Sequence, residues 1–166
     1  MNVWIVYDSK YGNNKQIAEA LAGLFKEGNE VHVHHAKDVS PKEAAESKPD
    51  ILLFGGPPRA GMISFTIKGW ARKFASALKS KGLQLKKAAV WGTHAVNNEE
   101  TPPKFAWPSI EPKWKALLAE MPAAKSMPGV LGINIMDKEG GGGLGGILEA
   151  GWKDLVASFA EGVKTL

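Results

Sequence analysis

A short polar turn near the start of the chain, SKYGNN, combines residue types that could bind an anion. It follows an apolar run and precedes a helical pattern, so free N–H groups and the helix dipole would favour negative charge there. The side chains that could support such binding are polar, cationic or absent: Ser9, Lys10, Gly12, Asn14 and Lys15. This chemistry suits a phosphate, although capping of the helix by Asn13 or Asn14 explains the same residue types.

Strand-like apolar runs recur along the whole chain and position this turn. They are Val3–Tyr7, Val31–His35, Ile51–Phe54, Ala88–Trp91 and Val130–Met136. Helical periodicity fills the segments between them, and such alternation predicts an α/β fold with a parallel sheet and helices on both faces. Because ligands of open α/β sheets bind beyond the carboxyl ends of the strands, the polar turn would lie at the ligand edge.

The pattern predicts the start of one helix and the apolar stripe of another. Pro112 can begin a helix, since proline is favoured in the first turn. The last helix is expected to present one apolar stripe to the core: Leu148, Trp152, Leu155, Phe159 and Val163.

The composition is that of a globular protein, with 44% hydrophobic and 23% charged residues among 166. We therefore expect one domain, residues 1–166. The absence of cysteine excludes disulfides and thiolate metal sites. No signal peptide and no membrane span are evident, which favours a cytoplasmic protein.

Positive charge is concentrated in one segment, Lys68–Lys87, which holds seven basic residues and no acidic one. A solvated outer helix face is the simplest interpretation, and attraction of an acidic protein partner is the functional one. Nucleic acid is not expected as a partner, because the chain has only two arginines.

Other motifs are weaker. His32 and His34 share one face of a strand, but two histidines without a third ligand make a poor metal site. Gly141, Gly143 and Gly146 match a dinucleotide pattern, yet the strand and acidic residue that should follow are missing. A loop that covers the ligand edge is the better interpretation of this glycine run.

Three segments resemble loops of the flavodoxin family. YDSKYGNNKQIAEAL is similar to its phosphate-binding signature, Ser/Thr-x-Thr-Gly-x-Thr, with Ser9 and Gly12 matching and Tyr11 and Asn14 replacing threonines. ILLFGGPPRAGM resembles the third strand and flavin loop, and AAVWGTHAV resembles the fourth strand and its Gly-Thr loop. The resemblance covers nearly the whole chain.

This resemblance implies a flavodoxin-like, doubly wound sheet of five parallel strands in the order 2-1-3-4-5, with FMN bound by three loops. The residues carried over are Ser9, Lys10, Tyr11, Gly12, Asn13, Asn14, Pro57, Pro58, Arg59, Ala60, Gly61, Gly92, Thr93 and His94. Many family members stack an aromatic side chain on the flavin, and the 57–62 loop here has none.

The function implied is electron transfer by bound FMN to and from a redox protein partner. Two alternatives stay open. One is an FMN-dependent NAD(P)H:quinone reductase, with the 94–111 loop as a roof over the substrate. The other is a flavin-free interaction module on the same fold. A carrier needs no catalytic acid or base, and no catalytic residue is assigned.

Overall fold

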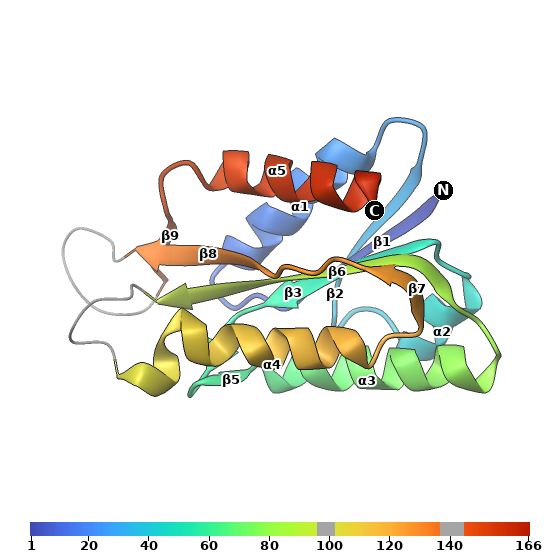
Figure 1. The fold of residues 1–166 in the computed structure, drawn as a ribbon, viewed down its shortest axis with the longest axis horizontal. Helices are drawn as coiled ribbons and strands as arrows, with labels where there is room; N and C mark the ends of the chain where they lie inside the picture. Colours follow the sequence, from blue (N-terminus) through green and yellow to red (C-terminus); the bar gives the residue numbers. More distant parts are fainter. Residues whose placement is uncertain (96–101, 137–144) are drawn as a thin grey trace.

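The computed structural model describes residues 1–95, 102–136 and 145–166, and its elements alternate along the chain (Figure 1). The strands are β1 (Asn2–Tyr7), β2 (Glu30–His35), β3 (Ile51–Gly56), β4 (Pro58–Arg59), β5 (Met62–Ile63), β6 (Leu85–Ala95), β7 (Ala123–Ser126), β8 (Leu131–Met136) and β9 (Ile147–Leu148). The helices are α1 (Asn13–Phe25), α2 (Pro41–Glu46), α3 (Phe65–Ser80), α4 (Trp107–Ala119), α5 (Trp152–Thr165) and the 3₁₀ turn η1 (Pro103–Phe105).

The main sheet confirms the predicted strand order. β2, β1, β3 and β6 lie side by side in parallel, and β8 continues the sheet beyond β6. The fifth position is split, because β7 pairs with the start of β6 and β8 with its end. The strand expected at Val130–Met136 therefore corresponds only to β8, the second of these two strands. The short β9 adds an antiparallel edge to β8.

Helices cover both faces of this sheet, as predicted. α1 and α5 lie on one face, and α2, α3 and α4 lie on the other (Figure 1). Strand residues alternate between two separate cores: Trp4 and Val6 pack with the α3 and α4 side, whereas Val3 and Ile5 pack with α1 and α5. This alternation follows from the period of two along a strand.

Three glycines on neighbouring strands make room for tryptophan rings. A Cβ on Gly55 would lie 2.2 Å from Trp91, one on Gly92 2.3 Å from Trp114, and one on Gly132 2.5 Å from Trp107. No Cβ fits at these distances, so glycine lets the indoles lie directly on the sheet backbone. Gly92 thereby faces the α4 layer.

Two of the predicted helix details are wrong. α4 begins at Trp107 rather than Pro112: Pro108 occupies its first turn, and Pro112 lies inside the helix. In α5 the buried residues are Val156, Phe159, Ala160 and Val163. Phe159 and Val163 of the expected stripe are therefore confirmed, whereas Leu155 is 42% exposed and Leu148 belongs to β9.

Within the described ranges, no helix combines the length and apolarity that a membrane crossing requires.

Candidate functional site

A cavity of about 250 Å³ lies at the carboxyl edge of the sheet, where the turn after β1, the hairpin after β3 and the end of β6 meet. We call it the three-loop cavity. Its lining residues are Ser9, Lys10, Tyr11, Asn13, Asn14, Pro57, Pro58, Arg59, Thr93, His94, Ala95, Ile135, Gly145 and Gly146. The structure therefore brings together most of the residues that the sequence predicted, from three separate segments.

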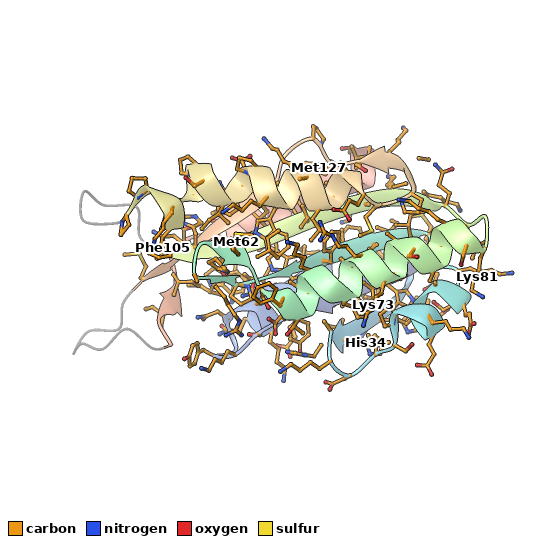
Figure 2. All side chains as sticks on the ribbon, turned by 90° about the horizontal axis from the view of Figure 1, so that it is seen from below. His34, Met62, Lys73, Lys81, Phe105 and Met127 are labelled. Carbon is orange, nitrogen blue, oxygen red and sulfur yellow. The ribbon has the colours of Figure 1, made fainter. Side chains whose placement is uncertain are left out.

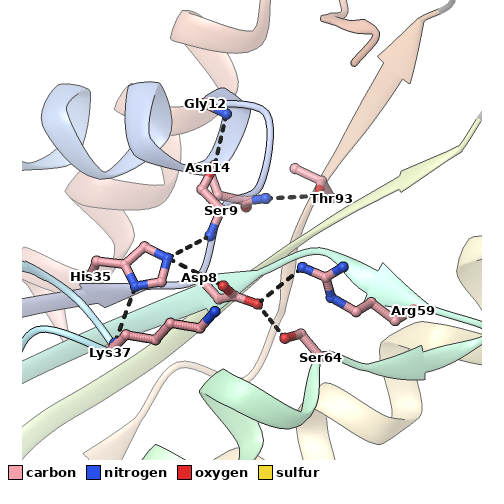
Figure 3. A network of polar contacts seen from close by, with 9 residues as sticks. All are labelled: Asp8, Ser9, Gly12, Asn14, His35, Lys37, Arg59, Ser64 and Thr93. Atoms are coloured by element: carbon pink, nitrogen blue, oxygen red, sulfur yellow. Dashed lines mark hydrogen bonds and ion pairs between the residues drawn. The ribbon is translucent and has the colours of Figure 1, made fainter. Parts of the chain in front are cut away.

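The start of α1 forms one end of this cavity. Gly12 is its N-cap, with a left-handed φ of 89°, and no side chain caps the helix. The Gly12 N–H donates to the Ser9 hydroxyl at 3.1 Å, which closes the turn (Figure 3). The first turn holds no acidic residue, so backbone N–H groups and the positive end of the dipole are available to an anion.

Capping by Asn13 or Asn14 is wrong, because both side chains are used elsewhere. The Asn13 amide donates to the Gly146 carbonyl at 2.8 Å and so links α1 to the chain before β9. The Asn14 amide donates to the Thr93 hydroxyl at 3.1 Å, and its oxygen accepts from the Trp91 indole at 3.0 Å. Asn14 is only 3% exposed, so it acts as a buried bridge between two loops of the cavity.

The loop after β3 is a small hairpin of β4 and β5. Its turn residues, Ala60 and Gly61, both have positive φ, 50° and 74°. The Gly61 carbonyl accepts from the Lys113 ammonium of α4, and a Cβ on Gly61 would lie 2.8 Å from the Lys104 carbonyl. The hairpin presents Pro57, Pro58 and Arg59 to the cavity, while Ala60 and Gly61 are not among its lining residues.

The end of β6 supplies a third wall, because Gly92, Thr93 and His94, expected in a loop, continue the strand and pair with β8. Thr93 and His94 are nearly buried and line the cavity, and Gly92 does not, since it faces Trp114. The His94 ring packs against Trp107, with 4.8 Å between centroids. The expected roof, 94–111, is described only in part, because residues 96–101 lie outside the described ranges. Gly141 and Gly143 of the glycine run also lie outside them.

Two aromatic residues near the cavity differ in whether they can reach a ligand. Trp91 is fully buried under the cavity and cannot face a ligand. Tyr11 is 48% exposed and lines the cavity, with the Lys10 ammonium 5.2 Å from its ring centroid. Tyr11, at the position of a family threonine, is therefore the accessible aromatic side chain at this site.

Sequence reasoning missed a buried carboxylate beside the turn. Asp8 is 2% exposed, and Ser64 at the start of α3 donates its hydroxyl proton to it (Figure 3). Arg59 forms an ion pair with Asp8 at 3.8 Å, and Nε2 of His35 lies 3.3 Å from an Asp8 carboxylate oxygen. Asp8 thus ties the loops after β1, β2 and β3 together. The signal for Asp8 that was available in the sequence is an acidic residue directly after an apolar strand.

The His35 ring contacts the backbone on both sides. The backbone N–H of Lys37 lies 3.1 Å from Nδ1, and that of Ser9 lies 3.3 Å from Nε2. Nε2 also lies 3.3 Å from an Asp8 carboxylate oxygen, so His35 connects the end of β2 to the turn after β1.

The two histidines of β2 do not form a metal site. His32 and His34 pack on Trp4, with ring centroids 5.1 Å and 5.0 Å away. Burial and the neighbouring His32 lower the pKa of His34. In the ranges that the structure describes, no three metal-ligating side chains come together.

The parallel sheet order and the cavity above its carboxyl edge define a flavodoxin-like α/β protein. A sequence model described as "Flavodoxin domain" matches residues 4–121. The chain therefore belongs to the flavodoxin domain family. No curated protein matches the chain at a significant level.

Solved structures with the same fold are distant in sequence. Oxidised flavodoxin 1 from Bacillus cereus is 20% identical, with a TM-score of 0.71, and the alignment covers 99% of this chain and 98% of that one. A WrbA-like flavodoxin from Agrobacterium tumefaciens is 17% identical, with a TM-score of 0.68 and coverages of 99% and 95%. Rubredoxin oxygen:oxidoreductase from Desulfovibrio gigas is 15% identical, with a TM-score of 0.72 over 99% of this chain. The chain spans only 35% of that larger protein.

Proposed function

We propose that this protein binds FMN in the three-loop cavity and transfers electrons between redox proteins. The observation that carries the proposal is the uncapped start of α1, which opens into a cavity that two further loops complete. The donors fit a phosphomonoester: backbone N–H groups at the dipole's positive end, the Ser9 hydroxyl, and the Lys10 ammonium.

The far walls of the cavity suit a flat apolar ring. Pro57, Pro58 and Ile135 offer apolar surface, and Tyr11 and His94 offer ring faces. Bound FMN would supply the redox chemistry, and the protein would orient it and control access to it. Asn14 and Asp8 would hold the three loops at fixed separations, so the cavity is formed before the ligand arrives.

The partner is proposed to be an acidic redox protein, although much of the basic segment is engaged within the chain. Arg72 binds Glu120 through Nε at 3.0 Å and through a terminal nitrogen at 2.8 Å, which lowers the pKa of Glu120. Lys81 pairs with Glu46 and Lys86 with Asp50. Lys87 binds the last carbonyls of α5. On α3, the positive charge that remains for a partner is therefore that of the other lysines, such as Lys73 (Figure 2).

The partner proposal is tested by reversing charge without breaking an ion pair. Lys68→Glu with Lys73→Glu should slow electron transfer to an acidic partner, most strongly at low salt, because surface steering is screened by ions. The FMN affinity should not change. A rate that ignores both the double substitution and the salt concentration would contradict an acidic partner.

The cofactor proposal is tested on the purified protein by an absorbance spectrum and by titration with FMN and FAD. We expect a flavin spectrum after reconstitution and preference for FMN, because a loop closed at a helix start suits a terminal phosphate. A protein that stays colourless would favour the flavin-free module. Rapid steady-state reduction of quinones by NAD(P)H would favour the reductase.

A further inference from the structure

A second cavity, of about 520 Å³, lies beside the three-loop cavity, between the ends of β1 and β2 and the start of α3. We call it the Phe65 cavity. Its lining residues are Asp8, Ser9, Lys10, His35, Lys37, Arg59, Ser64, Phe65 and Thr66. Ser9, Lys10 and Arg59 line both cavities, so the two share a wall. The volume falls in the range of small-molecule sites, about 300–1,000 Å³.

The charge of the Phe65 cavity is positive. Lys10, Lys37 and Arg59 line it together with a single carboxylate, that of Asp8. Asp8 is buried, accepts from the Ser64 hydroxyl and pairs with Arg59 at 3.8 Å. The side chains of Lys37 and Arg59 lie on opposite sides of Asp8 (Figure 3). After Asp8 offsets one cation, two positive charges remain, which matches a phosphate better than a carboxylate.

One wall of the Phe65 cavity is an aromatic ring that is exposed to solvent. Phe65, the first residue of α3, is 76% exposed, the most exposed of the large apolar side chains in the described ranges. Its neighbours Ile63 and Ile67 are buried in the core, so the backbone holds the ring at the rim. A flat base can stack on such a ring face, and stacking of this kind tolerates any base.

We propose that the Phe65 cavity binds a nucleoside phosphate as a second ligand next to the flavin site. Lys37 and Arg59 hold the phosphate groups, Lys10 on the shared wall adds positive charge, and Phe65 stacks on the base. The proposal goes beyond FMN binding, because six lining residues, among them Lys37, Phe65 and Thr66, do not line the three-loop cavity.

The test is calorimetric titration of the full chain with ADP, adenosine and pyrophosphate. ADP should bind more tightly than either fragment, because only ADP uses both the cations and the ring. Phe65→Ala should weaken ADP roughly fivefold or more and leave pyrophosphate unchanged. Lys37→Ala should weaken both ligands roughly tenfold. Leu155→Ala and Lys125→Ala, exposed residues on α5 and β7, are the matched controls and should change neither.

Three results would overturn the proposal. One is ADP binding that is no tighter than that of adenosine or pyrophosphate. Another is unchanged ADP affinity in Phe65→Ala. The third is retention of FAD in preference to FMN, since a single dinucleotide would then span both cavities. The ADP titration does not require bound flavin. If FMN fails to bind, the ADP result therefore still tests this proposal by itself.

Discussion

The starts of α1 and α2 use similar residues in opposite ways. At α2, Ser40 has extended backbone angles, and its hydroxyl accepts from the Glu43 N–H, with Glu43 in the first turn. This is an ordinary capped start. At α1, the N-cap is Gly12, and the polar side chains that could cap the helix, Asn13 and Asn14, bind other segments. A helix whose own polar side chains leave its N–H groups free presents those groups to a ligand.

The largest expected effect comes from removing the buried bridge. Asn14→Ala leaves the Trp91 indole N–H and the Thr93 hydroxyl without their partner in the protein interior. Unsatisfied buried groups cost about 1–3 kcal/mol each, so the free energy of unfolding should fall by about 2–6 kcal/mol. Chemical denaturation measures this change. Asn13→Ala, which removes one partly exposed bond, should cost about 1 kcal/mol, and equal losses would show that Asn14 is no bridge.

Ser9→Ala tests the contribution of the Ser9 hydroxyl to FMN binding separately from its contribution to folding. The Ser9 hydroxyl closes the turn before α1 and is free to donate its proton to a phosphate. A hydrogen bond to a charged group contributes about 1.5–3 kcal/mol, so FMN affinity should fall roughly tenfold or more. The melting temperature of the apoprotein should change little. Unaltered FMN affinity, measured by titration of the apoprotein, would remove Ser9 from the site.

Gly12→Ala tests the unusual N-cap of α1. A Cβ at this position meets no atom within 4 Å, so any cost must come from the left-handed backbone. That conformation costs a non-glycine residue about 1–2 kcal/mol. The matched control is Gly23→Ala in the same helix, also in open space but with ordinary φ, which should stabilise by up to about 1 kcal/mol. Effects of the same sign at both positions would refute the role of the backbone.

The smallest effect is expected at the ordinary cap. Ser40→Ala removes the side-chain acceptor for the Glu43 N–H and should lower the free energy of unfolding by about 1 kcal/mol. Because α2 does not contact the three-loop cavity, the FMN affinity should equal that of the unaltered protein. A loss of FMN affinity in Ser40→Ala would mean that the two helix starts are not independent.

Strand and helix periodicity predicted the alternation of elements and the parallel sheet, because both depend on local patterns. The sheet order and the gathering of three loops were predicted from the resemblance to flavodoxins. The sequence could not predict which partners Asn13 and Asn14 choose, because Gly146 and Thr93 are far along the chain. The Asp8 network was missed for the same reason. The start of α4 was misplaced because Pro108 and Pro112 both look like first-turn residues, and the packing of Trp107 against His94 supports the earlier start.

The central claim is that the free N–H groups at the start of α1 hold the phosphate of FMN, and comparison of FMN with riboflavin tests it most directly. The two molecules differ only in that phosphate, so calorimetric titration of the apoprotein isolates its contribution. Two charge-assisted hydrogen bonds contribute about 3 kcal/mol, which predicts roughly hundredfold tighter binding of FMN. Equal affinities for FMN and riboflavin would contradict the account.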